Sequence, residues 1–272
     1  MMSNVNLKFA HVASTIIVIL ALVASAGGLL IDGLYRDNAL VTAGWFGNDL
    51  VTLAVAVPLL VASLLLSVRG SRRAHLVWLG MIAYMVYNFA YYLFGTAFNA
   101  FFLIYVTVFD LSILALIFGL IGLDIDAIGG RFRTRTPARW IAGYMGIVAV
   151  GLIIVYVTQS LGFVVSGELP EIVSLTEKST NVVFALDLSL VVPWFVLAAI
   201  WVWRRRPWGY VLATIVNVKG AVYMLALSAV TISAVQSGAS DDLAQVGLWG
   251  VIGLGSLIVS VSLLRNLGPI TG

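Results

Sequence analysis

The sequence predicts an all-α membrane protein, a polytopic bundle of about eight transmembrane helices in a single integral membrane domain over residues 1–272. Hydrophobic residues make up 61% of the chain and charged residues only 10%. A soluble domain carries about 25% charged residues, so the composition is typical of membrane proteins. Apolar runs recur along the whole chain, and the connections between them are too short to form a soluble domain.

Eight apolar runs approach the roughly 20 residues that a spanning helix needs in order to satisfy its backbone inside the bilayer. They cover residues 10–31, 50–68, 76–95, 100–122, 140–161, 182–203, 208–233 and 243–264. The first run also fits a cleavable signal peptide, with Lys8 before it and Ala24-Ser25-Ala26 within it. We expect this helix to be retained, because its apolar stretch continues to Ile31.

The distribution of charge predicts the orientation of these helices. With the N-terminus in the cytoplasm, twelve of the 15 basic residues fall inside, two fall outside, and Lys219 lies within the seventh run. This asymmetry follows the positive-inside rule, so we expect both termini in the cytoplasm and the protein in a plasma membrane such as the bacterial inner membrane. The inner residues are Lys8, Arg69, Arg72, Arg73, Arg131, Arg133, Arg135, Arg139, Arg204, Arg205, Arg206 and Arg265, and the outer ones are Arg36 and Lys178. The acidic residues assigned to the outer connections are Asp32, Asp37, Asp49, Glu168, Glu171, Glu177, Asp241 and Asp242.

The same inventory excludes several classes of function. The basic residues act as topology signals and lipid head-group contacts, so no nucleic-acid partner is expected. The chain has no cysteine, which excludes disulfides and thiolate chemistry. His11 and His75 are the only histidines, and a zinc, haem or di-iron site would be short of ligands. We therefore expect no metal and no cofactor, with membrane lipids and a small polar or ionic ligand as partners.

Pro58 and Pro193 indicate an internal repeat. Each follows a valine, each precedes a basic turn by the same number of residues, and the two prolines lie 135 residues apart. That offset is close to half of the chain, so the predicted halves are residues 1–135 and 136–272. Four helices in each half would share one orientation, which makes the repeats parallel and related by an axis along the membrane normal. In this register Lys219 takes the place of Tyr84.

Lys219 stands alone in the long apolar run that starts at Tyr210, and it is the main candidate for function. A charge at the bilayer centre costs at least about 2.5–3.5 kcal/mol, and such residues normally pair with one another or mark a pathway. From a helical rise of about 1.5 Å per residue, Lys219 lies roughly 20 Å from the inner boundary. Asp110 reaches about 21 Å and Asn88 about 22 Å, while Asp187 lies near 25 Å, close to the outer rim.

Lys219 and Asp110 are therefore the expected electrostatic pair, either as a structural salt bridge or as a site for an ion, a proton or a substrate. Asn217 lies about 200° around the helix from Lys219 and faces another neighbour. On the third helix, Tyr84, Tyr87 and Asn88 begin a stripe that continues to Tyr91 and Tyr92 at helical spacing. The stripe is either inward packing with satisfied hydroxyls or a cavity wall that hydrogen-bonds a ligand. Asp187 is either a charge near a helix N-terminus or the outer mouth of a pathway.

Residues Tyr87–Asn99 and Arg204–Ala213 resemble uncharacterised multi-pass membrane proteins of bacteria, and the resemblance extends over most of helices two to seven. This resemblance carries no activity over to these residues.

The sequence favours a transporter, channel or small-ligand binder that uses the polar layer, and a non-enzymatic role. One alternative is an intramembrane enzyme acting on a lipid or isoprenoid, for which Asp124 and Asp126 are the only candidate pair. We expect this pair instead to mark the start of a solvated loop. A retinal protein with Lys219 as Schiff-base amine is disfavoured by the eighth helix and by the orientation. A structural or assembly subunit, whose charges only lock helices together, is the remaining alternative.

Overall fold

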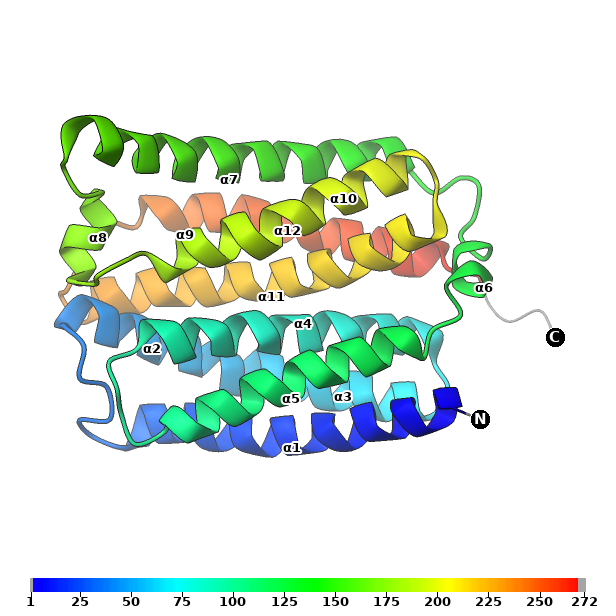
Figure 1. The fold of residues 1–272 in the computed structure, drawn as a ribbon, viewed down its shortest axis with the longest axis horizontal. Coiled ribbons are helices and arrows are strands. Elements are labelled where there is room, and N and C mark those ends of the chain that lie inside the picture. Colours follow the sequence, from blue (N-terminus) through cyan, green and yellow to red (C-terminus); the bar gives the residue numbers. More distant parts are fainter. Residues whose placement is uncertain (1, 269–272) are drawn as a thin grey trace.

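The protein is a bundle of long helices that run side by side (Figure 1). A computed structural model describes residues 2–268. The elements in chain order are α1 (Met2–Leu30), α2 (Ala39–Val51), η1 (Thr52–Ala56), α3 (Val57–Val68), α4 (Arg72–Gly95), α5 (Phe102–Ile121), α6 (Ile125–Gly129), α7 (Ala138–Ser166), α8 (Glu171–Thr176), α9 (Val182–Leu186), η2 (Asp187–Val191), α10 (Val192–Trp203), α11 (Pro207–Gln236) and α12 (Ala244–Asn266). The elements η1 and η2 are single stretches of π-helix.

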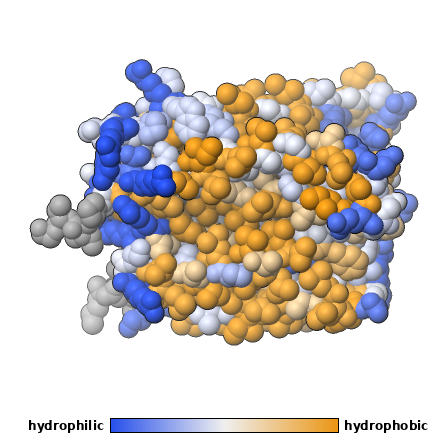
Figure 2. All heavy atoms as spheres, turned by 180° about the vertical axis from the view of Figure 1, so that it is seen from behind, coloured by the Kyte–Doolittle hydropathy of each residue, from blue (hydrophilic) through white to orange (hydrophobic). Residues whose placement is uncertain are grey.

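Eight helical segments in the described part of the chain are long and apolar enough to cross a membrane. Two of them are composite: α2, η1 and α3 form one span over Ala39–Val68, and α9, η2 and α10 form another over Val182–Trp203. Figure 2 shows a broad hydrophobic band across one face of the bundle, with hydrophilic residues gathered at its two ends. The prediction of an all-helical fold with eight helices long and apolar enough to span a membrane is confirmed.

The second span begins earlier than predicted. It starts at Ala39 rather than at residue 50, so Asn48 and Asp49 lie within a helix instead of an outer connection. Both side chains are buried in the bundle. The assignment of Asp49 to an outer connection was therefore wrong, because these polar residues interrupt the apolar run while the fold supplies them with hydrogen-bond partners.

The long helices form two groups that meet along the centre of the molecule. Helices α1 to α5 make one group and α7 to α12 the other, with α4 and α11 facing each other between them (Figure 1). A Cβ atom on Gly80 of α4 would lie 2.6 Å from Val218 of α11, and one on Gly47 of α2 would lie 2.4 Å from the carbonyl oxygen of Ala229. These two glycines let α11 approach the first group closely, so the central helices are the best shielded part of the bundle.

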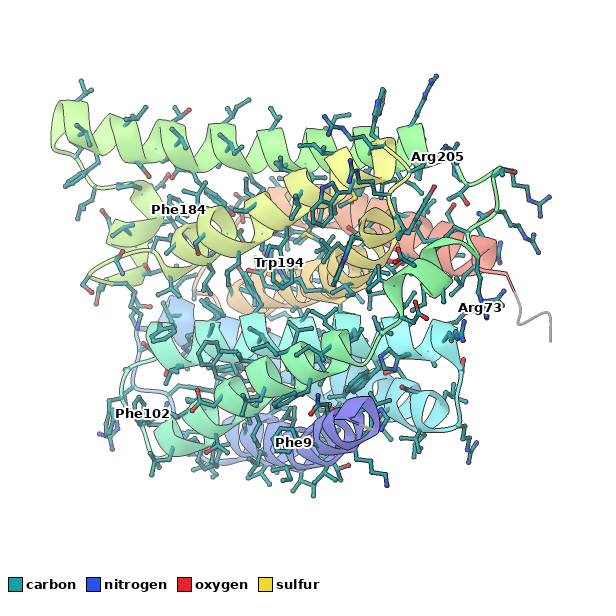
Figure 3. All side chains as sticks on the ribbon, turned by 45° about the vertical axis from the view of Figure 1, so that its right-hand side comes forward. Phe9, Arg73, Phe102, Phe184, Trp194 and Arg205 are labelled. Atoms are coloured by element: carbon teal, nitrogen blue, oxygen red, sulfur yellow. The ribbon has the colours of Figure 1, made fainter. Side chains whose placement is uncertain are left out.

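The two ends of the bundle differ in charge. Arg73 and Arg205 lie at the end where α1 begins and α12 ends, and Phe102 lies towards the opposite end (Figures 1 and 3). Arg73 donates a hydrogen bond to the carbonyl of Leu267 at 2.7 Å, which ties the end of α12 to the start of α4. At the acidic end, Lys178 forms a salt bridge with the buried Asp37 and joins the α8–α9 connection of one group to the α1–α2 connection of the other.

Each composite span contains its π-helical stretch immediately before a Val-Pro pair, Val57-Pro58 in one case and Val192-Pro193 in the other. Proline has no N–H to donate and its ring clashes with the carbonyl four residues earlier. A π-helical stretch shifts that carbonyl to a partner one residue further along the helix, and such stretches recur at functional sites. In the second group the stretch begins at Asp187.

The basic turns that follow these spans have the same backbone hydrogen bonds. Arg69 N–H bonds to Leu65 O and Gly70 N–H to Ser67 O, while Arg204 N–H bonds to Ile200 O and Arg205 N–H to Val202 O, each 135 positions later. The second residue of each turn has a left-handed backbone: Gly70 has a φ of 88° and Arg205 has a φ of 52°. Glycine adopts this conformation at no steric cost, whereas arginine does not. A side chain in this left-handed region costs roughly 1–2 kcal/mol. The Arg205 guanidinium offsets part of this by donating to the carbonyl of Thr134 at 3.0 Å.

Candidate functional site

Lys219 lies on α11 at the junction of the two helix groups, and its side chain is buried, with 7% of its surface exposed. Its Nζ lies 3.6 Å from the ring centre of Tyr87 on α4 and 4.2 Å from that of Tyr223 on its own helix. Tyr223 follows Lys219 by one turn, so helical spacing brings the two side chains to the same face. An ammonium held over aromatic faces gains about 2 kcal/mol or more when it is desolvated, which offsets part of the cost of burying the charge.

Asp187 provides the negative charge next to this ammonium. It is the first residue of η2, its side chain is 4% exposed, and its carboxylate attracts Lys219 electrostatically. Its Oδ1 accepts a hydrogen bond from Tyr87 at 2.7 Å, and its Oδ2 accepts one from Tyr156 of α7 at 2.7 Å. Because Tyr87 contacts both charges, one with its ring and one with its hydroxyl, it connects the first helix group to the charged pair in the second.

The hydroxyl oxygens of Tyr87 and Tyr223 lie 3.1 Å apart and their rings meet edge to face at 4.6 Å. Together with Tyr156, these phenols enclose Lys219 and Asp187 in a set that we call the charged cluster: Lys219, Asp187, Tyr87, Tyr156 and Tyr223. Within residues 2–268, the Lys219 ammonium donates no hydrogen bond, although it carries three N–H donors. The cluster balances the positive charge and leaves its donors unused.

A cavity of about 340 Å³ lies beside the charged cluster, between α4 and α5 of the first group and α9 to α11 of the second. Its polar lining residues are Lys219 and Tyr87, and the rest of the lining is aliphatic or aromatic. Trp194 of α10, near the middle of the bundle (Figure 3), is one of these aromatic residues. Phe94 and Ile117 line the cavity and are also exposed on the bundle surface, so the cavity opens towards the apolar exterior.

A second groove of about 410 Å³ lies on the other side of the α4–α11 junction, between α3 and α12. Its lining includes Val218 and Val222 of α11 and Leu59 of α3, and none of its lining residues within the described chain is charged. The two grooves thus flank one junction, and the one that contains Lys219 is the candidate site.

The first helix group has a polar cluster of its own without a cation. Asn48 donates to Asn88 at 2.9 Å, and Asn88 donates to Thr52 at 3.2 Å. The Thr52 hydroxyl lies 3.3 Å from the Tyr84 hydroxyl. These contacts satisfy the polar groups internally, which fits a structural role for Tyr84 and Asn88.

The structure separates several residues that the sequence grouped together. Asp110 is exposed on α5 and forms no salt bridge with Lys219, so the expected pairing was wrong; Asp187 occupies that place. Asn217 is fully buried and donates to the carbonyl of Ala213 at 2.8 Å, as a side chain that folds back on its own helix. The tyrosine stripe is divided: Tyr87 faces the charged cluster, whereas Tyr84 faces the first group.

Sequence reasoning missed Tyr156 and Tyr223 as members of the cluster. Tyr223 carried a usable signal, because it lies four residues after Lys219 on one helix. Tyr156 stands singly among apolar residues of α7, and nothing in its local sequence connects it to Asp187.

The described residues contain no group of three or more histidine, aspartate or glutamate side chains arranged to hold a metal ion. No protein-family model, curated protein or solved structure matches the chain. The candidate site therefore has to be interpreted from its own geometry.

Proposed function

We propose that the protein is a membrane transporter or receptor-like binder that takes up a small molecule in the cavity beside Lys219. The eight apolar helices support a multi-pass membrane protein, and the charged cluster supplies the polar part of the site. The observation that carries the proposal is the Lys219 ammonium, which is buried, lies at a cavity wall and has unused hydrogen-bond donors. A ligand oxygen at this position would satisfy donors that the protein leaves free.

A purely structural role predicts a different arrangement. A buried pair that only locks helices compensates its desolvation by direct, hydrogen-bonded contact between the two charges. Here Asp187 is hydrogen-bonded by Tyr87 and Tyr156, and Lys219 is held by ring faces. Each carboxylate oxygen thus accepts a hydrogen bond from a phenol, while the ammonium stays available at the cavity.

The cavity also restricts the ligand. Apart from Lys219 and Tyr87, its walls are apolar, including Phe109, Trp194 and Phe195. A ligand that fits both parts has an apolar body and one hydrogen-bond acceptor, either an anionic oxygen or a carbonyl. The opening near Phe94 admits such a molecule from the hydrophobic layer of the membrane.

The proposed architecture is a parallel repeat of two four-helix halves with both termini in the cytoplasm. The identical offset of the π-helical stretches, the Val-Pro pairs and the basic turns supports the repeat. The offset relates Thr52, Tyr84 and Asn88 to Asp187, Lys219 and Tyr223. Both triads cluster in space, and only the second is charged. Repeat-built membrane transporters commonly bind their substrates at the interface between the repeats, near the middle of the bilayer.

For the alternative of a lipid-modifying enzyme, the structure gives one of the two candidate acids a structural role. Asp124 caps α6, where its side chain accepts a hydrogen bond from the Ala127 backbone at 2.9 Å. That contact explains an acid at the start of a short helix without any catalytic role.

A thermal-stability screen of the purified protein tests the proposal. The probes are a series of linear fatty acids and the matching primary alcohols, which share an apolar body and differ in the anionic group. We expect fatty acids to stabilise the wild type by about 2.7 kcal/mol at a hundredfold excess over the dissociation constant. The same stabilisation should appear in Lys178→Met and be lost in Lys219→Met.

Equal stabilisation of Lys219→Met by the fatty acids would contradict the proposed role of the ammonium. A wild type that responds to neither series, while the charged cluster is intact, would favour the structural alternative.

A further inference from the structure

A second buried carboxylate, Asp49, lies in the first helix group away from the charged cluster. Its side chain is 1% exposed and sits on α2 within the membrane-spanning segment. Tyr92 of α4 donates a hydrogen bond to its Oδ1 at 2.7 Å, and Tyr35 donates one to its Oδ2 at 2.5 Å. Tyr35 belongs to the connection between α1 and α2 and inserts its ring from the acidic end of the bundle.

Helix α1 is shaped to receive this carboxylate. A Cβ atom on Gly28 would lie 2.0 Å from Asp49 Oδ2 and 2.5 Å from the Tyr35 hydroxyl, so only glycine leaves room for both groups. Ser25, one helical turn before Gly28, is fully buried and its hydroxyl faces the Asp49 carboxylate. Its Oγ has no hydrogen-bond partner. The serine hydroxyl is thus placed where it can donate to the carboxylate or accept from the carboxylic acid.

The charge of Asp49 has no counterpart among the described residues. The titratable groups that face it, besides Tyr35 and Tyr92, are Tyr84 of α4 and Tyr105 of α5, and all of them are phenols. At Gly47 on α2, the nearest atoms of helix α11 belong to Ala229 and Val230. Asp37, a further acid that acts on Tyr105, has a buried side chain and is paired with Lys178.

An ionised carboxylate without a cation is costly in this environment, since even after relaxation the penalty is several kcal/mol per ion. Asp187 avoids this cost because Lys219 lies beside it. Asp49 is surrounded by neutral donors alone: the phenols of Tyr35 and Tyr92 bond to its two oxygens, and the hydroxyl of Ser25 lies beside it.

We infer that Asp49 is a proton-binding site, in which the bound proton lies between its carboxyl group and Ser25 Oγ. In the neutral state the carboxylic O–H donates to Ser25 while both carboxyl oxygens still accept from Tyr35 and Tyr92. On release the proton leaves as a hydrated proton towards the acidic end, and the two phenols stabilise the carboxylate that remains. This site stands independently of the function proposed for the charged cluster.

Tyr35 is the group through which the site reaches the outer connection. Burial, followed by the adjacent Asp49 charge, raises the pKa of Tyr35 well above its ordinary value. Tyr35 therefore remains a hydrogen-bond donor throughout the physiological range, and the titrating group is Asp49.

Infrared difference spectroscopy of the full-length protein in lipid tests this inference. We expect a carboxylic C=O band at neutral pH that shifts on ¹³C-aspartate labelling, disappears as pH rises and is absent in Asp49→Asn. The matched control is Asp110→Asn, which removes an exposed carboxylate from α5 and should leave the band unchanged. A wild-type spectrum without such a band, or a band that persists in Asp49→Asn, would overturn the inference.

The conservative variant Tyr35→Phe provides a second measurement if Asp49→Asn does not fold. It removes one donor to the ionised form, so the midpoint of the band's titration should move to higher pH. An unchanged midpoint would contradict the assignment. A midpoint that moves with sodium concentration at constant ionic strength would also contradict it, because the site would then bind a metal cation.

Discussion

Substitution of Tyr87 by phenylalanine separates the two contacts through which this residue connects the charged cluster. The ring stays, so the contact to Lys219 Nζ at 3.6 Å is retained. The hydroxyl is lost, and with it the 2.7 Å bond to Asp187 and the 3.1 Å contact to Tyr223. A hydrogen bond to a charged group contributes about 1.5–3 kcal/mol, and a neutral one about 0.5–1.5 kcal/mol.

Hydrogen bonds inside membrane proteins fall towards the low end of such ranges, at about 0.6 kcal/mol on average and about 1.7 kcal/mol at most. Two contacts are lost, one of them to a charged group, so we expect Tyr87→Phe to lower the free energy of unfolding by about 1–2 kcal/mol. The matched control is Tyr84→Phe on the same helix, which loses one contact of 3.3 Å to Thr52 and should cost less than about 1 kcal/mol. Equilibrium unfolding in mixed micelles measures both.

The comparison refutes the reasoning if Tyr87→Phe costs no more than Tyr84→Phe. Asp187 would then not depend on the Tyr87 hydroxyl, and the connection between the two helix groups through this residue would be absent.

Two further predictions concern the junction and the orientation. Gly80→Ala should destabilise the protein by about 1–3 kcal/mol, because the new methyl group meets Val218 across the α4–α11 contact. The control is Gly146→Ala on α7, where the methyl group enters open space; in the same unfolding assay it should be neutral or slightly stabilising. A cysteine at Gly70 should react with a membrane-impermeant thiol reagent only from the cytoplasmic side and one at Ser240 only from the outside, and the reverse pattern would invert the proposed topology.

The number and order of the spans followed from the sequence because long apolar runs have few alternatives in a membrane. The start of the second span did not. Asn48 and Asp49 lower the local hydropathy, and their burial depends on phenols supplied by Tyr35 and Tyr92, which are distant in sequence. A window of hydropathy contains no information about such partners.

The charged cluster was predictable only in part. The burial of Lys219 followed from its place in an apolar run, but the choice of its partner rested on depth alone. Depth places Asp110 and Lys219 in one layer, yet it does not say which way each side chain points around its helix. In the structure Asp110 is exposed, and η2 places Asp187 where Tyr87 and Tyr156 can reach it.

A double-mutant cycle on Lys219 and Asp187 tests most directly whether the two charges form one unit. Lys219→Met and Asp187→Asn should each lower the free energy of unfolding by about 3–5 kcal/mol, because each leaves the other charge buried without its counterpart. The double mutant should lose clearly less than the sum, whereas Asp110→Asn should cost within about 0.5 kcal/mol of zero and add to Lys219→Met without coupling. Additive losses for Lys219 and Asp187, or coupling between Lys219 and Asp110, would contradict the account.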